Sequence, residues 1–193
     1  MSEVDDAGLL DRARKGDEAA FAELFGRHQR AIYRFAVHMC GADAGDDIVQ
    51  ETFLAVLQQR DRPDLPRGPV LGYLMGIARH RIWKRLAGAD EPVVLLDDEA
   101  ASRASVSADL DALALLAHAE LVAAVRQAVR ALPAPYREVV VLCELEELNY
   151  ADVAGVMGCP IGTVRSRLHR ARALLAVRLG AMPAIEPAGT RER

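Results

Sequence analysis

Cysteines, aromatic side chains and long apolar runs are all scarce in this chain of 193 residues. Its three cysteines are Cys40, Cys143 and Cys159, an odd number with wide spacing and no C-x-x-C pair. This spacing favours neither a disulfide framework nor a cysteine zinc site, so we expect buried or idle thiols. No apolar run approaches the roughly 20 residues of a membrane-spanning helix, and the first residues are charged where a signal peptide is apolar. We therefore expect a cytoplasmic protein that does not insert into membranes.

Motifs that mark common enzyme classes are also missing. The five histidines are scattered, and the sequence has no H-x-x-x-H pair and no glycine-rich phosphate loop. Acidic residues fall at the starts of expected helices and in the middle of the chain. The sequence therefore predicts no catalytic residue, no metal site and no cofactor, and an enzyme is the least favoured of three functional hypotheses.

Positive charge is not in excess, because 28 acidic residues outnumber 24 lysines and arginines and give a formal net charge of -4. This balance argues against a general nucleic-acid coat protein and requires any DNA-binding surface to be local. One stretch meets that requirement. The segment CPIGTVRSRLHRARALL, residues 159–175, carries four arginines, and no acid occurs from Val153 through Ile185.

Apolar residues recur every three or four positions along most of the chain, which predicts amphipathic helices. No strand pair or hairpin signal appears, so the predicted fold class is all-α. The expected helices of a first block lie at about 17–40, 43–60 and 70–86, and those of a second block at 119–132, 136–148, 149–158 and 161–179. The segment DRPDLPRGP, residues 61–69, has three prolines and a glycine and predicts a loop.

The middle of the chain differs from both blocks. Residues 88–118 contain seven acids against one base, Arg103, and have no sustained apolar period. This composition predicts a flexible acidic linker, whose later part could begin a helix. We therefore expect a helical domain at 1–87, the linker at 88–118, a second helical domain at 119–180 and a disordered tail at 181–193.

Two helices joined by a short turn at Gly158–Cys159–Pro160 predict a helix-turn-helix, whose second helix enters the DNA major groove. In that helix we expect a core-facing stripe of Ile161, Val164, Leu168, Ala171 and Leu175. The other faces carry the candidate DNA-contacting residues Thr163, Arg165, Ser166, Arg167, His169, Arg170 and Arg172. Arginines can bind guanine edges or phosphates, whereas Ser and His can hydrogen-bond to either. The alternative is that the arginines only complement the helix dipole.

Two segments resemble one known family. The stretch LPAPYREVVVLCELEELNYADVAGVMGCPIGTVRSRLHRARALL resembles the C-terminal DNA-binding domain of bacterial sigma factors of the extracytoplasmic-function (ECF) group, and DDIVQETFLAVL resembles the polymerase-binding helix of their N-terminal domain. The resemblance implies a subunit that binds core RNA polymerase, reads a minus-thirty-five element with the second domain and opens a minus-ten element with the first. The competing hypothesis is a free-standing helix-turn-helix regulator that binds DNA without polymerase.

The helix resembling DDIVQETF docks on a coiled coil of the largest polymerase subunit in that family. Here Asp47, Gln50 and Glu51 lie at i, i+3 and i+4, so they share one face and can meet arginines of a partner helix. Phe53 fits either this face or the core. The alternative is a solvated acidic helix start with no partner. The resemblance also implies that an anti-sigma protein can cover such faces.

The third expected helix combines basic and aromatic residues. No acid occurs between Leu65 and Ala89, and the basic residues are interleaved with Tyr73 and Trp83. Such a surface suits a melted strand, whose phosphates attract cations and whose unstacked bases stack on flat side chains. By resemblance, this helix and the loop Asp61 to Pro69 hold flipped minus-ten bases. The candidate residues are Arg79, His80, Arg81, Trp83, Lys84 and Arg85.

Some positions of this helix depart from the family pattern. Tyr73 stands where a tryptophan is usual, His80 where an asparagine is usual and Lys84 where an acid is usual. The departures leave the role of the helix unchanged and bear on which minus-ten bases it prefers. The alternative interpretation places Trp83 and Tyr73 in the core, and for Tyr73 we favour it.

Overall fold

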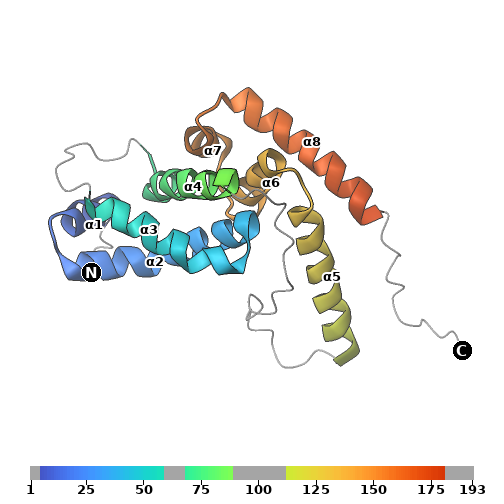
Figure 1. Cartoon of the computed structure of the whole chain (residues 1–193), viewed down its shortest axis with the longest axis horizontal. Helices are drawn as coiled ribbons and strands as arrows, with labels where there is room; N and C mark the ends of the chain where they lie inside the picture. The colour runs from blue at the N-terminus through green and yellow to red at the C-terminus, as the bar shows by residue number, and fades with distance from the viewer. Residues whose placement is uncertain (1–4, 59–67, 89–111, 181–193) are drawn as a thin grey trace, which may run out of the picture.

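The computed structural model describes residues 5–58, 68–88 and 112–180, and the side chains of these residues except 112–117. Helices make up the described chain, with no strand among those residues, as the sequence predicts (Figure 1). In chain order they are α1 (Asp6–Arg14), α2 (Glu18–Cys40), the 3-10 turn η1 (Ala42–Ala44), α3 (Gly45–Gln58), α4 (Val70–Gly88), α5 (Ala112–Arg130), α6 (Ala134–Val140), the π-helical segment η3 (Val141–Leu145), α7 (Tyr150–Met157) and α8 (Ile161–Gly180).

The first domain consists of α1 to α4. Helix α2 starts at a capped end, because the side chain of Asp17 accepts a hydrogen bond of 3.0 Å from the Ala20 amide. It ends before Gly41, which has a φ of 95°. Glycine adopts this positive φ without the steric penalty that a Cβ atom would bring. Leu24, Phe35 and Leu74 are fully buried and lie at the centre of this domain.

Helix α1 precedes the first helix that the sequence predicts. Leu9, Leu10 and Ala13 of α1 are buried against the rest of the first domain. Their spacing of three and four is the helical signal, which a segment of nine residues carries only weakly. Helix α1 therefore adds a layer to the first domain that the sequence prediction omitted.

The second domain consists of α5 to α8. Helix α5 begins at Ala112, inside the span 88–118 expected to be linker, because the segment ALALLA is rich in strong helix formers. The rest of the expected linker, residues 89–111, lies outside the described residues, as do the loop residues 61–67 and the tail 181–193. The Val139–Val141 run is buried in helix, as predicted.

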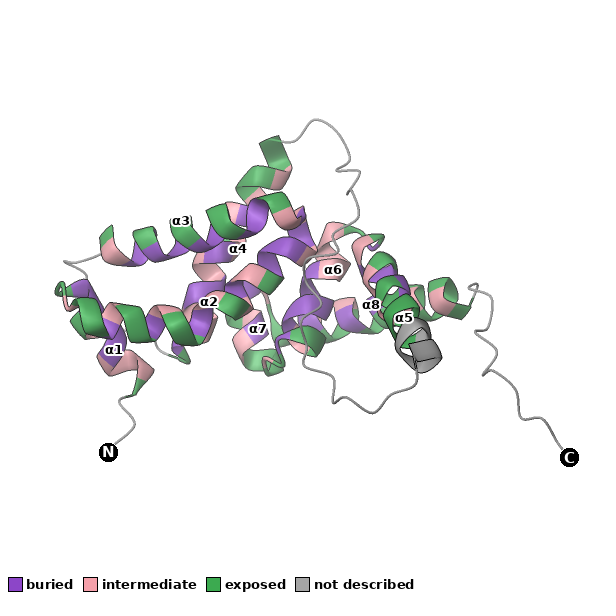
Figure 2. Ribbon diagram, turned by 90° about the horizontal axis from the view of Figure 1, so that it is seen from below, coloured by how far each residue is buried: buried purple, intermediate pink, exposed green. Residues whose placement is uncertain are grey.

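The two domains pack against each other. Helix α4 lies against α7, and the C-terminal part of α2 lies against α6 (Figure 1). One continuous cluster of buried apolar residues runs through both domains, from Leu10 and Ile82 in the first to Val139 and Val153 in the second. Buried residues, purple in Figure 2, accordingly occur on the helices of both domains. The domain contact thus covers surfaces of α4 and α6. These surfaces would be exposed to solvent if the two domains were separated.

Candidate nucleic-acid interface

Helices α7 and α8 form the predicted helix-turn-helix. Helix α7 is capped by Asn149, whose side-chain oxygen accepts a bond of 2.9 Å from the Asp152 amide. Gly158 ends it in the left-handed conformation at φ 61°, and the Cys159 amide donates to the Ala154 carbonyl at 3.1 Å. This Schellman pattern turns the chain within three residues, so the direction of α8 is set by local hydrogen bonds.

One stripe of α8 packs on the second domain. Val164, Leu168 and Ala171 are at most 2% exposed, as predicted, and Leu175 is partly buried. Ile161 departs from the predicted stripe, because it is 39% exposed. It is the first residue of the helix, and the packing of α8 begins only at Val164, one turn later.

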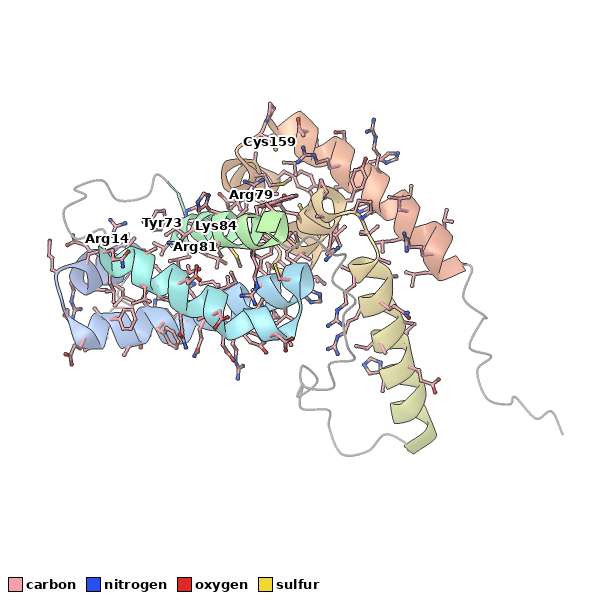
Figure 3. All side chains as sticks on the ribbon, viewed as in Figure 1. Arg14, Tyr73, Arg79, Arg81, Lys84 and Cys159 are labelled. Atoms are coloured by element: carbon pink, nitrogen blue, oxygen red, sulfur yellow. The ribbon has the colours of Figure 1, made fainter. Side chains whose placement is uncertain are left out.

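The remaining faces of α8 are open to solvent. Arg165, Ser166, His169, Arg170 and Arg172 are exposed, whereas Thr163 and Arg167 are half-buried. The helix runs along the outer edge of the molecule, with side chains projecting away from it (Figure 3). The seven predicted residues are therefore brought together on one helix, with the two half-buried ones at the margin of the packed stripe.

Three contacts hold the polar side chains of α8. Arg172 Nη2 lies 2.5 Å from Glu144 Oε1, and both side chains are more than 40% exposed. The guanidinium of Arg165 lies 6.0 Å from the ring centre of Tyr150, and Ser166 Oγ donates to the Thr163 carbonyl. Tyr150, which the sequence analysis did not select, is 38% exposed at the start of α7 and adds an aromatic surface beside Arg165.

Helix α4 divides the six predicted minus-ten residues into three pairs at i, i+4. Arg79 and Trp83 point toward the second domain, where Arg79 Nε donates to Glu138 Oε1 at 2.6 Å and Trp83 Nε1 donates to the same oxygen at 2.9 Å (Figure 3). His80 and Lys84 are exposed. The structure thus separates residues that the sequence placed in one group.

The third pair, Arg81 and Arg85, faces α3. Arg81 Nε lies 3.6 Å from Glu51 Oε2, and Arg85 Nη1 lies 3.3 Å from Asp47 Oδ2. These two acids belong to the predicted polymerase-docking set, so the two predicted surfaces adjoin each other along α3 and α4.

Tyr73 is tied to the first domain. Its hydroxyl accepts a bond of 2.9 Å from Arg14 Nη2, and the Arg14 guanidinium lies 5.4 Å from the centre of its ring. Arg14 is only 4% exposed, and Tyr73 packs against the apolar core. Tyr73 therefore has the packing role that the sequence analysis favoured for it, whereas half-buried Trp83 contacts the second domain.

The acidic face of α3 is open. Asp47, Gln50 and Glu51 are all exposed, with the side chains of Asp47 and Glu51 at 61% and 52%. Leu54, seven residues after Asp47, is 55% exposed and extends the same face with an apolar side chain. The sequence analysis missed it, although its i+7 spacing from Asp47 is visible in the sequence. Phe53 belongs to the core, where its ring packs edge-to-face against Phe21 and at a tilt against Phe25.

A cavity of about 700 Å³ lies between α4 and α7. Small residues line it on both sides, namely Gly72 and Gly76 of α4 and Ala151 and Gly155 of α7. His80 and Arg81 of α4 also line it. The packing of the two domains is thus incomplete beside the cationic part of α4.

Burial and charge shift the pKa of several groups near the domain contact. Burial, together with the positive charge of Arg130 and Arg126, lowers the pKa of His38 to about 4. Burial raises the pKa of the Cys143 thiol to about 11 and also raises that of Cys40. All three cysteines are free and half-buried. At pH 7 the lowered pKa of His38 leaves its ring neutral, and the raised pKa values of Cys40 and Cys143 move their thiols further from ionisation.

Membrane-spanning helices and metal-binding clusters are both absent from the described residues. None of their helices is long and apolar enough to cross a membrane. Within the same residues, no group of three or more His, Cys, Asp or Glu side chains is placed to hold a metal ion.

Comparison with known proteins agrees with this arrangement. The family of sigma-70 region 2 matches residues 24–91, and the family of sigma-70 region 4 matches residues 123–175. The ECF RNA polymerase sigma factor SigC of Mycobacterium tuberculosis is 32% identical over 174 residues, which are 85% of this chain and 86% of the relative.

Two solved structures share the fold. CnrH, solved in complex with the cytosolic domain of CnrY, is 26% identical with a TM-score of 0.66, over 92% of this chain and 99% of CnrH. The sigma factor RpoE of Bartonella quintana, solved in complex with the anti-sigma factor NepR, is 23% identical with a TM-score of 0.59, over 80% of this chain and 93% of RpoE.

The fold and the exposed cationic helix define a helical DNA-binding protein of the transcription machinery. The chain belongs to the ECF sigma factors of the sigma-70 family. It therefore acts in promoter-specific initiation of transcription by RNA polymerase, and the hypothesis of a free-standing regulator is not favoured.

Proposed function

We propose that the described surfaces divide the work of initiation between the domains. Helix α8 reads the minus-thirty-five element with the exposed residues around Arg165 and Arg170. The open face of α3 docks on core polymerase through Asp47, Glu51 and Leu54. The cationic residues of α4 hold the melted minus-ten strand. The observation that carries this proposal is the solvent-exposed face of α8, which bears arginines and no acid.

The charges of the two proposed DNA surfaces suit different modes of DNA recognition. Exposed arginines on a helix that can enter the major groove suit hydrogen bonds to base edges and phosphates. Basic side chains with Trp83 on α4 suit an unstacked strand, whose bases can stack on the indole. In this scheme the chain supplies binding surfaces and no catalytic group, so it acts as an initiation factor and not as an enzyme. Its proposed place of action is the cytoplasm, where core polymerase and promoter DNA are found.

We also infer an anti-sigma protein as a regulatory partner. CnrH, whose fold this chain shares, was solved with a second protein bound. The exposed acids and Leu54 on α3 offer such a partner the same surface that we assign to polymerase. A protein bound there would exclude polymerase by occupying that surface.

Reconstituted transcription tests the proposal. The full chain is added to core RNA polymerase on genomic DNA of the source organism, and transcript starts are mapped. We expect starts at a limited set of promoters with common minus-thirty-five and minus-ten sequences, and none of these with core polymerase alone. Starts unchanged by the chain, together with specific DNA binding in the absence of polymerase, would instead support the free-standing regulator.

A further inference from the structure

Glu138 is a buried acid at the contact between the two domains. It lies on α6, and its side chain is 0% exposed. Its Oε1 atom accepts both the bond from Arg79 and the bond from Trp83. Its Oε2 atom is buried and has no hydrogen-bond partner among the described residues. One oxygen of the second domain therefore holds two side chains of α4.

Two further polar contacts support this junction. Arg137, the neighbour of Glu138, donates from Nη1 to the Met39 carbonyl at 3.0 Å, at the C-terminal end of α2. Arg34 of α2 forms a bidentate pair with Glu146, whose side chain is 1% exposed. Cations thus meet a helix C-terminus and a buried carboxylate across the junction, an arrangement that favours the packed state.

We propose that Glu138 is an autoinhibitory latch, which holds the free sigma factor closed by occupying the side chains that would bind the melted minus-ten strand. The inference rests on the proposed role of Arg79 and Trp83 in that strand's recognition. The carboxylate takes the place of a DNA phosphate at the Arg79 guanidinium and holds Trp83 through its Nε1 atom. The Arg79 guanidinium then lies 5.8 Å from the centre of the indole ring on which a base would stack. Single-stranded DNA and Glu138 therefore compete for the same two groups.

The geometry suits a contact that opens. A buried carboxylate is a strong partner when both oxygens are bonded, but here Oε2 is left without a bond from the described residues and retains its desolvation cost. Opening returns Glu138 to water and satisfies that oxygen. New interactions with polymerase and promoter DNA can then offset the loss of the junction, so the DNA-binding surface becomes available where initiation takes place.

A single tryptophan makes the latch measurable in the full chain. Trp83 is the only tryptophan in the sequence, so its fluorescence reports on this junction alone. Glu138→Gln keeps the shape of the side chain and removes its charge. We expect the emission maximum to move to longer wavelength as the indole meets water. The apparent affinity for a labelled single-stranded DNA that carries a mapped minus-ten sequence should rise about tenfold, because a larger fraction of the chain is open.

Two further variants make the result decisive. Glu120→Gln makes the same charge change at an exposed position of α5 and should leave both measurements at their wild-type values. Arg34→Gln changes a half-exposed side chain of the first domain and leaves Glu146 of the second domain unpaired in the closed state. We therefore expect it to shift the emission maximum and the DNA affinity in the same direction as Glu138→Gln. If Glu138→Gln loses helical circular dichroism, Arg34→Gln decides.

The outcomes separate the latch from the proposed function. Wild-type emission and wild-type DNA affinity in Arg34→Gln, and in Glu138→Gln where it folds, would overturn the latch. A shift of the emission to longer wavelength without tighter DNA binding would show that Glu138 holds the two domains together but that Arg79 and Trp83 do not hold the minus-ten strand. That result would overturn the autoinhibitory role together with the proposed role of these two residues, whereas wild-type emission would overturn the latch alone.

Discussion

Arg85 Nη1 lies 3.3 Å from Asp47 Oδ2, so a cation of the proposed minus-ten helix faces an acid of the proposed polymerase-docking face. Both side chains are about half exposed, at 46% and 61%. Exposed pairs of this kind contribute about 0–1 kcal/mol, because water competes for both charges. Breaking the pair therefore costs little free energy, so Asp47 can bind polymerase and Arg85 can bind DNA.

Charge reversal on α3 should weaken binding to core polymerase. We expect the double variant Asp47→Lys and Glu51→Lys to lose about 2–5 kcal/mol of binding free energy, the range for close interfacial charge pairs. Helicity should be unchanged because both side chains are exposed. Asp46→Lys is the matched control on the same helix. Titration with labelled core polymerase measures the effect, and equal affinity in the wild type and both variants would remove the docking assignment.

Leu54 should contribute an apolar contact to the same interface. Leu54→Ala removes a side chain that is 55% exposed in the free protein, so the thermal midpoint of unfolding should change little. The free energy of binding to core polymerase should weaken by about 1 kcal/mol if the side chain is buried on binding, because only about half of it is exposed in the free protein. Leu121→Ala on α5, at 51% exposure, is the control. Wild-type affinity of Leu54→Ala would confine docking to the acids.

A close approach at the start of α3 should make Gly45 intolerant of a side chain. A Cβ atom there would lie 2.5 Å from Cε2 of Tyr33, so the ring has to move. We expect Gly45→Ala to lower the free energy of unfolding by about 1–3 kcal/mol. Gly26→Ala, on an open face of α2, should instead raise it by up to about 1 kcal/mol. Urea unfolding compares the two, and an equal effect of both would contradict the contact.

His38 should make the fold sensitive to mild acid. Because its pKa in the folded chain is about 4, below the ordinary 6.5, folding favours the neutral ring. Its stabilising contribution is complete above pH 6.5 and is lost as the pH falls toward 4, by about 2 kcal/mol at pH 5. Urea unfolding at pH 7.5 and pH 5 measures the loss. His38→Gln should reduce this loss, and an unchanged pH dependence in that variant would assign it to other groups.

Helix periodicity was enough to predict the all-α fold and the helix-turn-helix, because these depend on local spacing and on the turn at Gly158. The stripe Val164, Leu168 and Ala171 is buried as expected. Helix α1 is too short to carry a strong signal, and its burial depends on α2 and α3. The prediction from sequence therefore omitted α1, a helix that depends on long-range packing.

The division of α4 into three pairs could not be predicted for a related reason. The sequence places Arg79, Arg81 and Lys84 in one basic segment, and helical spacing shows that they point in different directions. Which direction meets an acid depends on the position of Glu138, 59 residues after Arg79. Charge composition predicted a cationic helix, whereas the partner of each cation required the tertiary structure.

Arg170 and Arg172 should have different roles on DNA. Arg170 is exposed on the face that also carries Ser166 and His169, in the N-terminal half of α8, the part that enters the groove. Arg170→Ala should cost about 1–3 kcal/mol on the preferred minus-thirty-five sequence and relax discrimination at one base. Arg172 is nearer the C-terminal half and is paired with Glu144. Its loss should weaken all sequences equally and lower the salt slope by roughly one unit.

Promoter binding by the holoenzyme at several salt concentrations measures this difference, with preferred and scrambled minus-thirty-five elements. Glu144→Gln is a control with the opposite expected effect. It frees Arg172 from its partner and should therefore strengthen binding to both minus-thirty-five elements alike. Arg170 is unaffected by that change, so the ratio between the two elements should stay at its wild-type value. If Arg170→Ala lowered affinity for both elements equally, its contact would be with phosphate and the bases would be read by other residues of α8.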